Sequence, residues 1–137
     1  MSNNAEFIHN MYAAFSRGDI PAILAAVADD AEWISYGPAG IPYAGVFKGP
    51  AGAAQFFQAL GGTQSEQKLT ILETYSDGDQ VMTVGRYSGV VNATQKRFDF
   101  EVAHFFTVRN GKVVRFLDFY DTAAQLEAYT SAARASA

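Results

Sequence analysis

Three ionisable residues interrupt otherwise apolar rows in three consecutive predicted strands. His104 is the only polar residue in the row that alternates along 98–108, and Asp118 interrupts a similar row in the next strand. Arg86 and Ser88 stand among apolar side chains of the preceding strand. A carboxylate, an imidazole and a guanidinium in one apolar pocket can act together in acid–base chemistry. We therefore predict Asp118, His104 and Arg86 as catalytic residues.

A structural interpretation competes with the catalytic one. In it, Arg86 and Asp118 form a buried ion pair, and His104 is a core side chain with satisfied hydrogen bonds. The repetition of one pattern on three adjacent strands favours a functional pocket.

Whether His104 and Asp118 share a face of the sheet depends on the turn between their strands. A two-residue turn at Asn110-Gly111 would place Asp118 opposite Ala103, across the sheet from His104. A three-residue turn with a glycine bulge would pair His104 with Phe116 and make His104 and Asp118 diagonal neighbours. The second register matches apolar residues with apolar residues, so we predict the bulged turn.

Further pocket residues follow from the apolar faces of the other elements. Tyr12 lies on the buried stripe of the first predicted helix, and Trp33 and Ser35 share one parity of the first strand. For Tyr12, Trp33 and Phe56, core packing is the alternative role. The residues predicted to bind a substrate are Tyr12, Trp33, Ser35, Phe56, Ser88, Phe100, Val102, Phe116 and Tyr120.

The composition excludes several classes of protein. The chain has 137 residues, no cysteine, two histidines and a net charge of -4, so we expect one domain over 1–137 without disulfides or a metal. Its scattered lysines and arginines form no basic stripe for nucleic acid. No signal peptide and no apolar run of about 20 residues is visible, so we expect a cytoplasmic protein that does not contact membranes.

The order of the predicted elements is that of an α+β domain. Helices are predicted at 7–15, after an Asp19 cap at 20–27, at 51–60 and after Asp121-Thr122, and strands at 31–36, 46–48, 68–76, 80–91, 96–109 and 112–120, with a loop at 37–45. The four long strands form a meander, and the helices are expected to pack against one curved sheet.

Several stretches of the chain resemble a known superfamily, the nuclear transport factor 2-like fold, and within it the SnoaL-like branch related to ketosteroid isomerases. The resembling stretches are Tyr12-Ala-Ala-Phe-Ser-Arg-Gly-Asp19, Ala28-Asp-Asp-Ala-Glu-Trp33, Gly85-Arg-Tyr-Ser-Gly89, Ala103-His-Phe-Phe-Thr-Val-Arg-Asn-Gly-Lys-Val113 and Phe119-Tyr-Asp-Thr122. The resemblance implies a cone of three N-terminal helices packed on a strongly curved, mostly antiparallel sheet.

The resemblance also implies candidate roles. In SnoaL-type polyketide cyclases an aspartate of the last strand is the acid–base group and a histidine lies on the strand before, and Asp118 and His104 look like these two. Relatives that hydrolyse epoxides use an arginine between two aspartates. Arg86 and Asp118 match two of these three, and Ser88 stands at the second aspartate.

The epoxide hydrolases and the ketosteroid isomerases match less completely. The water-holding tyrosine and asparagine of the epoxide hydrolases are replaced by Trp33 and Ser35. Ketosteroid isomerases have their proton-shuttling aspartate where Ser35 stands and their oxyanion-side aspartate where His104 stands, and Tyr12 is one position from their oxyanion tyrosine. The cyclase-like pair is therefore the best match.

These observations predict an enzyme that needs no cofactor. Its substrate is expected to be a small, largely apolar, oxygen-bearing molecule that undergoes isomerisation, aldol-type cyclisation or hydration in a closed pocket. The alternative is a non-catalytic module of the same fold that binds a small ligand or dimerises. A homodimer is expected in either case, because Tyr87, Leu117 and Phe119 are predicted to leave apolar surface on the outer face of the sheet.

Overall fold

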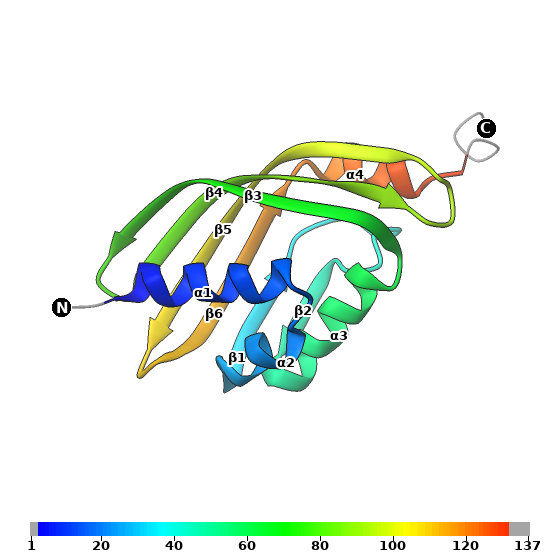
Figure 1. Cartoon of the computed structure of the whole chain (residues 1–137). Helices are drawn as coiled ribbons and strands as arrows, with labels where there is room; N and C mark the ends of the chain where they lie inside the picture. Colours follow the sequence, from blue (N-terminus) through cyan, green and yellow to red (C-terminus); the bar gives the residue numbers. More distant parts are fainter. Residues whose placement is uncertain (1–2, 132–137) are drawn as a thin grey trace.

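A curved six-stranded sheet with helices on its concave face forms the body of the molecule (Figure 1). The structure, a computed structural model, describes residues 3–131. The elements are α1 (Asn4–Ser16), α2 (Ile20–Ala25), β1 (Val27–Ser35), β2 (Gly45–Lys48), α3 (Gly49–Gly61), β3 (Gln64–Asp77), β4 (Gln80–Val91), β5 (Arg97–Arg109), β6 (Lys112–Tyr120) and α4 (Thr122–Tyr129). None of the helices within 3–131 is long and apolar enough to cross a bilayer.

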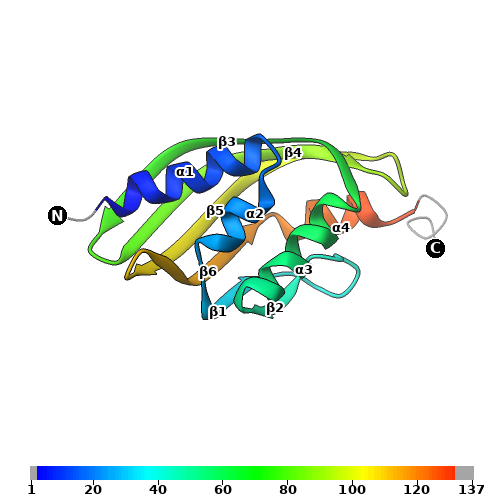
Figure 2. The same ribbon diagram turned by 60° about the horizontal axis from the view of Figure 1, so that its bottom comes forward.

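The strands lie in the order β2-β1-β6-β5-β4-β3, and all neighbours are antiparallel except β1 and β6. The parallel pair brings the first long strand beside the last one, so residues far apart in sequence meet at the middle of the sheet. Seen from below, α1 lies across β3 and β4, α3 covers β1 and β2, and α2 lies between these two helices (Figure 2). The α+β class and the helices on a curved, mostly antiparallel sheet are confirmed.

The predicted caps of two helices are confirmed. Asp19 precedes α2 and accepts a hydrogen bond from the backbone N–H of Ala22 at 3.2 Å. Asp121 precedes α4 and accepts from Ala124 at 3.0 Å. Each carboxylate satisfies an N–H that has no partner within its helix, which fixes where the helix begins.

Two strands begin earlier than predicted. β1 starts at Val27 and not at Ala31, and β3 starts at Gln64 and not at Lys68. The register of each strand shifts within its first part. Such irregularities break the alternation of buried and exposed residues, and that alternation is the only signal by which a sequence shows a half-buried strand.

The hairpin between β5 and β6 closes with a two-residue turn, so the predicted three-residue turn is wrong. Asn110 and Gly111 have φ of 52° and 71°, the combination found in a type I′ turn. The twist of this turn matches that of the two strands, which explains why it is preferred. By itself, however, it would place Asp118 on the face of the sheet opposite to His104.

A β-bulge reverses this effect. The register between β5 and β6 shifts by one residue between Val108 and Thr107, because β6 contains one extra residue there. Beyond the bulge, His104 pairs directly with Asp118. The prediction that the two residues share a face is confirmed, and they are direct partners where diagonal neighbours were predicted.

Candidate functional site

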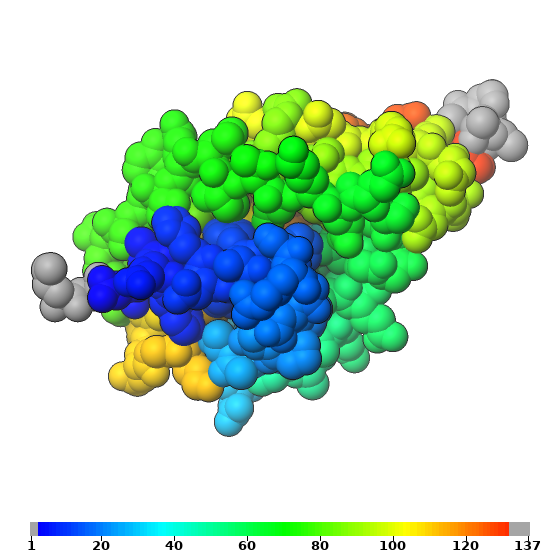
Figure 3. All heavy atoms as spheres, in the orientation of Figure 1, coloured from blue at the N-terminus to red at the C-terminus, as the bar shows by residue number. Residues whose placement is uncertain are grey.

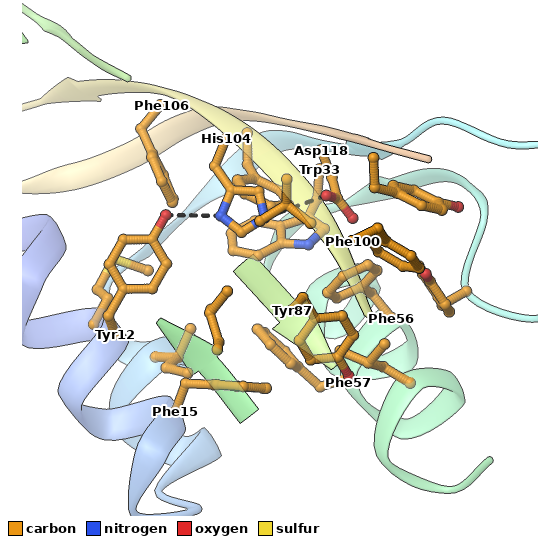
Figure 4. A pocket seen from close by; sticks show the side chains of 18 residues that line it. Tyr12, Phe15, Trp33, Phe56, Phe57, Tyr87, Phe100, His104, Phe106 and Asp118 are labelled. Carbon is orange, nitrogen blue, oxygen red and sulfur yellow. Dashed lines mark hydrogen bonds and ion pairs between the residues drawn. The ribbon is translucent and has the colours of Figure 1, made fainter. Parts of the chain in front are cut away.

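An apolar pocket lies between the helices and the concave face of the sheet (Figure 4). It is lined by Met11, Tyr12, Phe15, Ile23, Trp33, Tyr43, Phe56, Phe57, Leu60, Leu69, Tyr87, Phe100, Val102, His104, Phe106, Phe116, Asp118 and Tyr120. Most of these side chains are aliphatic or aromatic. Such a lining suits an apolar ligand whose orientation is fixed by a few polar groups.

His104 and Asp118 meet at the wall of this pocket. The Nε2 atom of His104 lies 3.3 Å from Oδ1 of Asp118, and the two side chains are 11% and 8% exposed. Ser35 of the neighbouring strand β1 donates its hydroxyl proton to Oδ2 of Asp118 at 2.9 Å. Each carboxylate oxygen of Asp118 thus has one partner, and each oxygen keeps a free lone-pair direction.

The second nitrogen of His104 is held from helix α1. Its Nδ1 atom lies 2.7 Å from the hydroxyl of Tyr12, which also lies 2.6 Å from the hydroxyl of Thr83. A carboxylate can only accept, so Nε2 carries a proton when Asp118 is ionised. In neutral His104 the Nδ1 atom then accepts from Tyr12, and Tyr12 accepts from Thr83. This chain of bonds fixes the ring against Asp118.

Arg86 and Ser88 lie outside the pocket, so the prediction that they share it with Asp118 is wrong. The Nε atom of Arg86 is 2.7 Å from Oδ1 of Asp99 on the outer face, and the Arg86 side chain is 50% exposed. Ser88 pairs with Asp99 in the same outer row. The reason is the register of β4 and β5, in which Thr83 is the residue that pairs with the inward-pointing His104.

No other cation takes the place that was predicted for Arg86. Across residues 3–131, no lysine or arginine lies within ion-pair distance of Asp118. The carboxylate is balanced by the hydroxyl of Ser35 and by His104, which can carry the compensating charge when it is protonated. The same residues contain no group of three histidine, aspartate or glutamate side chains that could hold a metal ion.

The structure places the other predicted pocket residues as follows. Those that line the pocket are Tyr12, Trp33, Phe56, Phe100, Val102, Phe116 and Tyr120. Ser35 is buried beside Asp118. Tyr87 was predicted on the outer face, and its place in the lining corrects that prediction.

The sequence analysis missed a buried polar cluster at the α4 end of the pocket. Tyr43 donates to Oε1 of Gln125 at 2.5 Å, and Tyr87 donates to Oε1 of Gln64. Gln64 in turn donates to Gln125 at 3.2 Å. These bonds fix the two tyrosine rings that form this end of the lining. Neither glutamine interrupts an apolar row in the sequence, so no pattern indicated them.

We expect alkaline pH to unfold the protein through its buried tyrosines. Burial raises the pKa of Tyr12, Tyr43 and Tyr87 above the ordinary 10.0, and it raises the pKa of Tyr120 to about 12. The folded state therefore holds these protons more tightly than the unfolded chain. Its stability is intact below pH 10 and falls as the pH rises through about 12.

Phenolate absorbance and far-ultraviolet circular dichroism, recorded together against pH, check this expectation. The phenolate signal of the buried tyrosines should appear as the dichroism is lost. Full ionisation of all seven tyrosines with unchanged dichroism would contradict it.

A shallow groove leads from the surface to the edge of the site. Between α1 and β3 the surface is hollowed, and the groove is lined by Tyr12, His9 and residues 71–74 (Figure 3). His9 bonds to the hydroxyl of Thr74 at 2.8 Å across it. Tyr12 contributes to both the groove and the inner pocket, so it separates His104 from the outside.

The curved, mostly antiparallel sheet with helices on its concave face is the fold of the nuclear transport factor 2-like proteins. Residues 8–116 match the family model of the SnoaL-like domain, and the chain belongs to that family. No protein with a curated description matches it significantly.

Three solved structures are similar along almost the whole chain. An NTF2-like protein from Burkholderia thailandensis is 33% identical, with 93% of this chain and 98% of that chain covered and a TM-score of 0.85. An NTF2-like protein of unknown function from Burkholderia pseudomallei is 28% identical, with 96% and 100% covered and a TM-score of 0.85. TerC, co-crystallised with polyporic acid, is 29% identical, with 93% and 98% covered and a TM-score of 0.83.

Proposed function

We propose that the protein binds a small, largely apolar, oxygen-bearing molecule in its inner pocket and catalyses proton transfer on it, with Asp118 as the base. The observation that carries this proposal is the His104–Asp118 pair, which lies in a wall that is otherwise mostly apolar. Because the rest of the lining is mostly apolar, a ligand in the pocket can exchange a proton with the protein at this pair.

The geometry supports a division of roles. Asp118 has free lone pairs toward the pocket and takes the proton from a carbon or oxygen of the ligand. Ser35 and His104 hold its two oxygens, so the carboxylate needs little rearrangement during the reaction. Tyr12 positions His104 and does not itself have to touch the ligand.

Removal of a proton beside a carbonyl is the first step shared by isomerisation and aldol-type cyclisation. In the apolar pocket the ionised carboxylate is less solvated than in water, and its interaction with a developing charge is stronger. The co-crystallisation of the similar protein TerC with polyporic acid supports an organic ligand here as well.

Deuterium exchange tests the proposal without knowledge of the natural substrate. β-Tetralone is a bicyclic ketone that is apolar apart from its carbonyl oxygen and has acidic α-hydrogens. In deuterium oxide, the protein should accelerate the loss of its α-proton NMR signal above the rate in buffer. If the ketone binds but exchanges at the buffer rate, the pocket is a binding module and the catalytic proposal fails.

We further propose that two copies associate through the outer face of the sheet. One row of apolar side chains crosses all six strands, formed by Val46, Ile34, Leu117, Phe105, Met82 and Tyr75. The ion pair of Arg115 and Glu32 flanks it on one side. On the other side the shorter row of Phe119, Ala103 and Val84 separates it from the ion pair of Arg86 and Asp99. Because each flank carries both signs of charge, a second copy meets no uniform repulsion.

Sedimentation at micromolar concentration should therefore show a dimer, and Phe105→Glu should convert it into a monomer by placing a charge in the middle of the apolar row. Asp77→Asn, at the far end of β3, should leave the dimer intact. A parent protein that sediments as a monomer would contradict this prediction.

A further inference from the structure

Two hydrogen-bond donors of the pocket lining, Trp33 Nε1 and the Tyr120 hydroxyl, have no acceptor within residues 3–131. The indole Nε1 of Trp33 is buried without a partner among residues 3–131, and the Trp33 residue is 2% exposed. Buried N–H groups are normally satisfied, because an unmade hydrogen bond costs free energy on desolvation. The indole ring is fixed by Phe116, whose centroid is 4.2 Å away, and by Phe56 and Phe57. The unpaired N–H therefore cannot turn easily toward another partner.

Two of the other donors near Asp118, His104 and Ser35, are already engaged. His104 uses one ring nitrogen for Asp118 and the other for Tyr12. Ser35 donates to Asp118. The hydroxyl of Tyr120 is also buried without a hydrogen bond of normal geometry within 3–131, but it lies beside Ser35 and Tyr43, toward which it can turn. Trp33 is thus a donor, held in place by its ring contacts, that a ligand in contact with Asp118 can use without breaking an existing bond.

Trp33 and Asp118 rise from the same face of neighbouring strands. Trp33 pairs with Phe116 in the parallel ladder of β1 and β6, and Asp118 follows two positions later on β6. The close-up shows the indole nitrogen turned toward the interior of the pocket, on the side of the Asp118 carboxylate (Figure 4). A donor and a proton acceptor therefore face the same space.

We propose that Trp33 Nε1 binds the carbonyl oxygen of the substrate and that the substrate is an enolisable ketone. The inference rests on the proposed function, and it adds the group that receives the negative charge. The α C–H bond breaks and its proton forms an O–H bond on Asp118. The electron pair of that bond becomes the C=C bond of an enolate, whose oxygen is held by the indole N–H. Return of the proton to another carbon completes an isomerisation. Replacement of the proton on Asp118 by one from the solvent, before a hydron returns to the same carbon, completes an exchange.

A direct test uses the fact that Trp33 is the single tryptophan of the chain. In a 15N-labelled parent protein the indole region of the NMR spectrum holds one cross-peak, which needs no assignment. β-Tetralone should move the indole proton downfield, as a new hydrogen bond does. Tetralin, which has the same two rings without the oxygen, should not produce that shift. Equal shifts with the two compounds, or no shift with either, would overturn the proposal.

Binding to a variant gives a second readout. In Trp33→Phe the aromatic ring stays and the N–H is lost, so the ratio of the tetralin to the β-tetralone dissociation constant should fall about tenfold, as expected for one hydrogen bond. Arg86→Gln on the outer face should keep the parent ratio. An unchanged ratio in Trp33→Phe would overturn the proposal.

The two proposals fail in different ways. If the indole proton responds to the ketone but no deuterium is exchanged, Trp33 recognises a carbonyl and the catalytic function is wrong. If exchange occurs and the indole does not respond, the catalytic function stands and the role of Trp33 is wrong.

Discussion

Asp118→Asn should lower the deuterium-exchange rate of β-tetralone at least a hundredfold while the protein remains folded. Asparagine has nearly the shape of aspartate and can still accept the hydrogen bond from Ser35. It cannot take up a proton, and general-base catalysis is worth about a hundredfold to ten-thousandfold. We expect the free energy of unfolding to change by no more than about 1 kcal/mol, since one hydrogen bond is exchanged for another.

Exchange kinetics by NMR and urea denaturation, on the same preparations, measure the two effects separately. Arg86→Gln is the matched control, because the sequence pattern and the structure place Arg86 on different faces of the sheet. The sequence pattern placed Arg86 beside Asp118, whereas the structure pairs it with Asp99 on the outer face. We therefore expect Arg86→Gln to exchange at the parent rate. Normal exchange by Asp118→Asn would refute the assignment of the base.

The largest loss of stability is expected from His104→Leu. Leucine fills a similar apolar space but leaves the carboxylate of Asp118 buried with Ser35 as its remaining partner. Removing the donor of a hydrogen bond to a buried carboxylate leaves that carboxylate less compensated and costs about 3 kcal/mol. The hydroxyl of Tyr12 loses its partner at the same time and keeps only Thr83.

A double-mutant cycle shows whether this cost belongs to the pair. Adding Asp118→Asn to His104→Leu removes the unpaired charge, so the double variant should recover most of the lost stability. Urea denaturation of the parent, both single variants and the double variant provides the four values. Equal instability of His104→Leu and the double variant would show that the loss comes from packing around His104 and not from the charge of Asp118.

The sequence predicted the helices, the strands and the inward face of β5 well, because the pattern of β5 is regular. Strand β5 alternates strictly, with bulky apolar residues inside and charged residues outside along most of its length, so the orientation of His104 was evident. Strand β4 lacks such contrast, because its outer row contains Met82 and Val84 while its inner row contains Thr83 and Gly85. The side of Arg86 could not be read from that pattern, and the register with β5 decided it.

What the sequence alone determined is the set of groups available for chemistry: one imidazole and one carboxylate in apolar rows, a single tryptophan, and no cysteine. The tertiary structure decided which of them meet. The bulge in β6 turned Asp118 to the side of His104, the parallel pairing with β1 brought Ser35 to it, and the packing of α1 brought Tyr12 to His104. The partners from α1 and β1 are separated from β5 and β6 by most of the chain. Local periodicity shows which face of an element is buried but not which distant element covers it, so these contacts follow only from the packing of the complete fold.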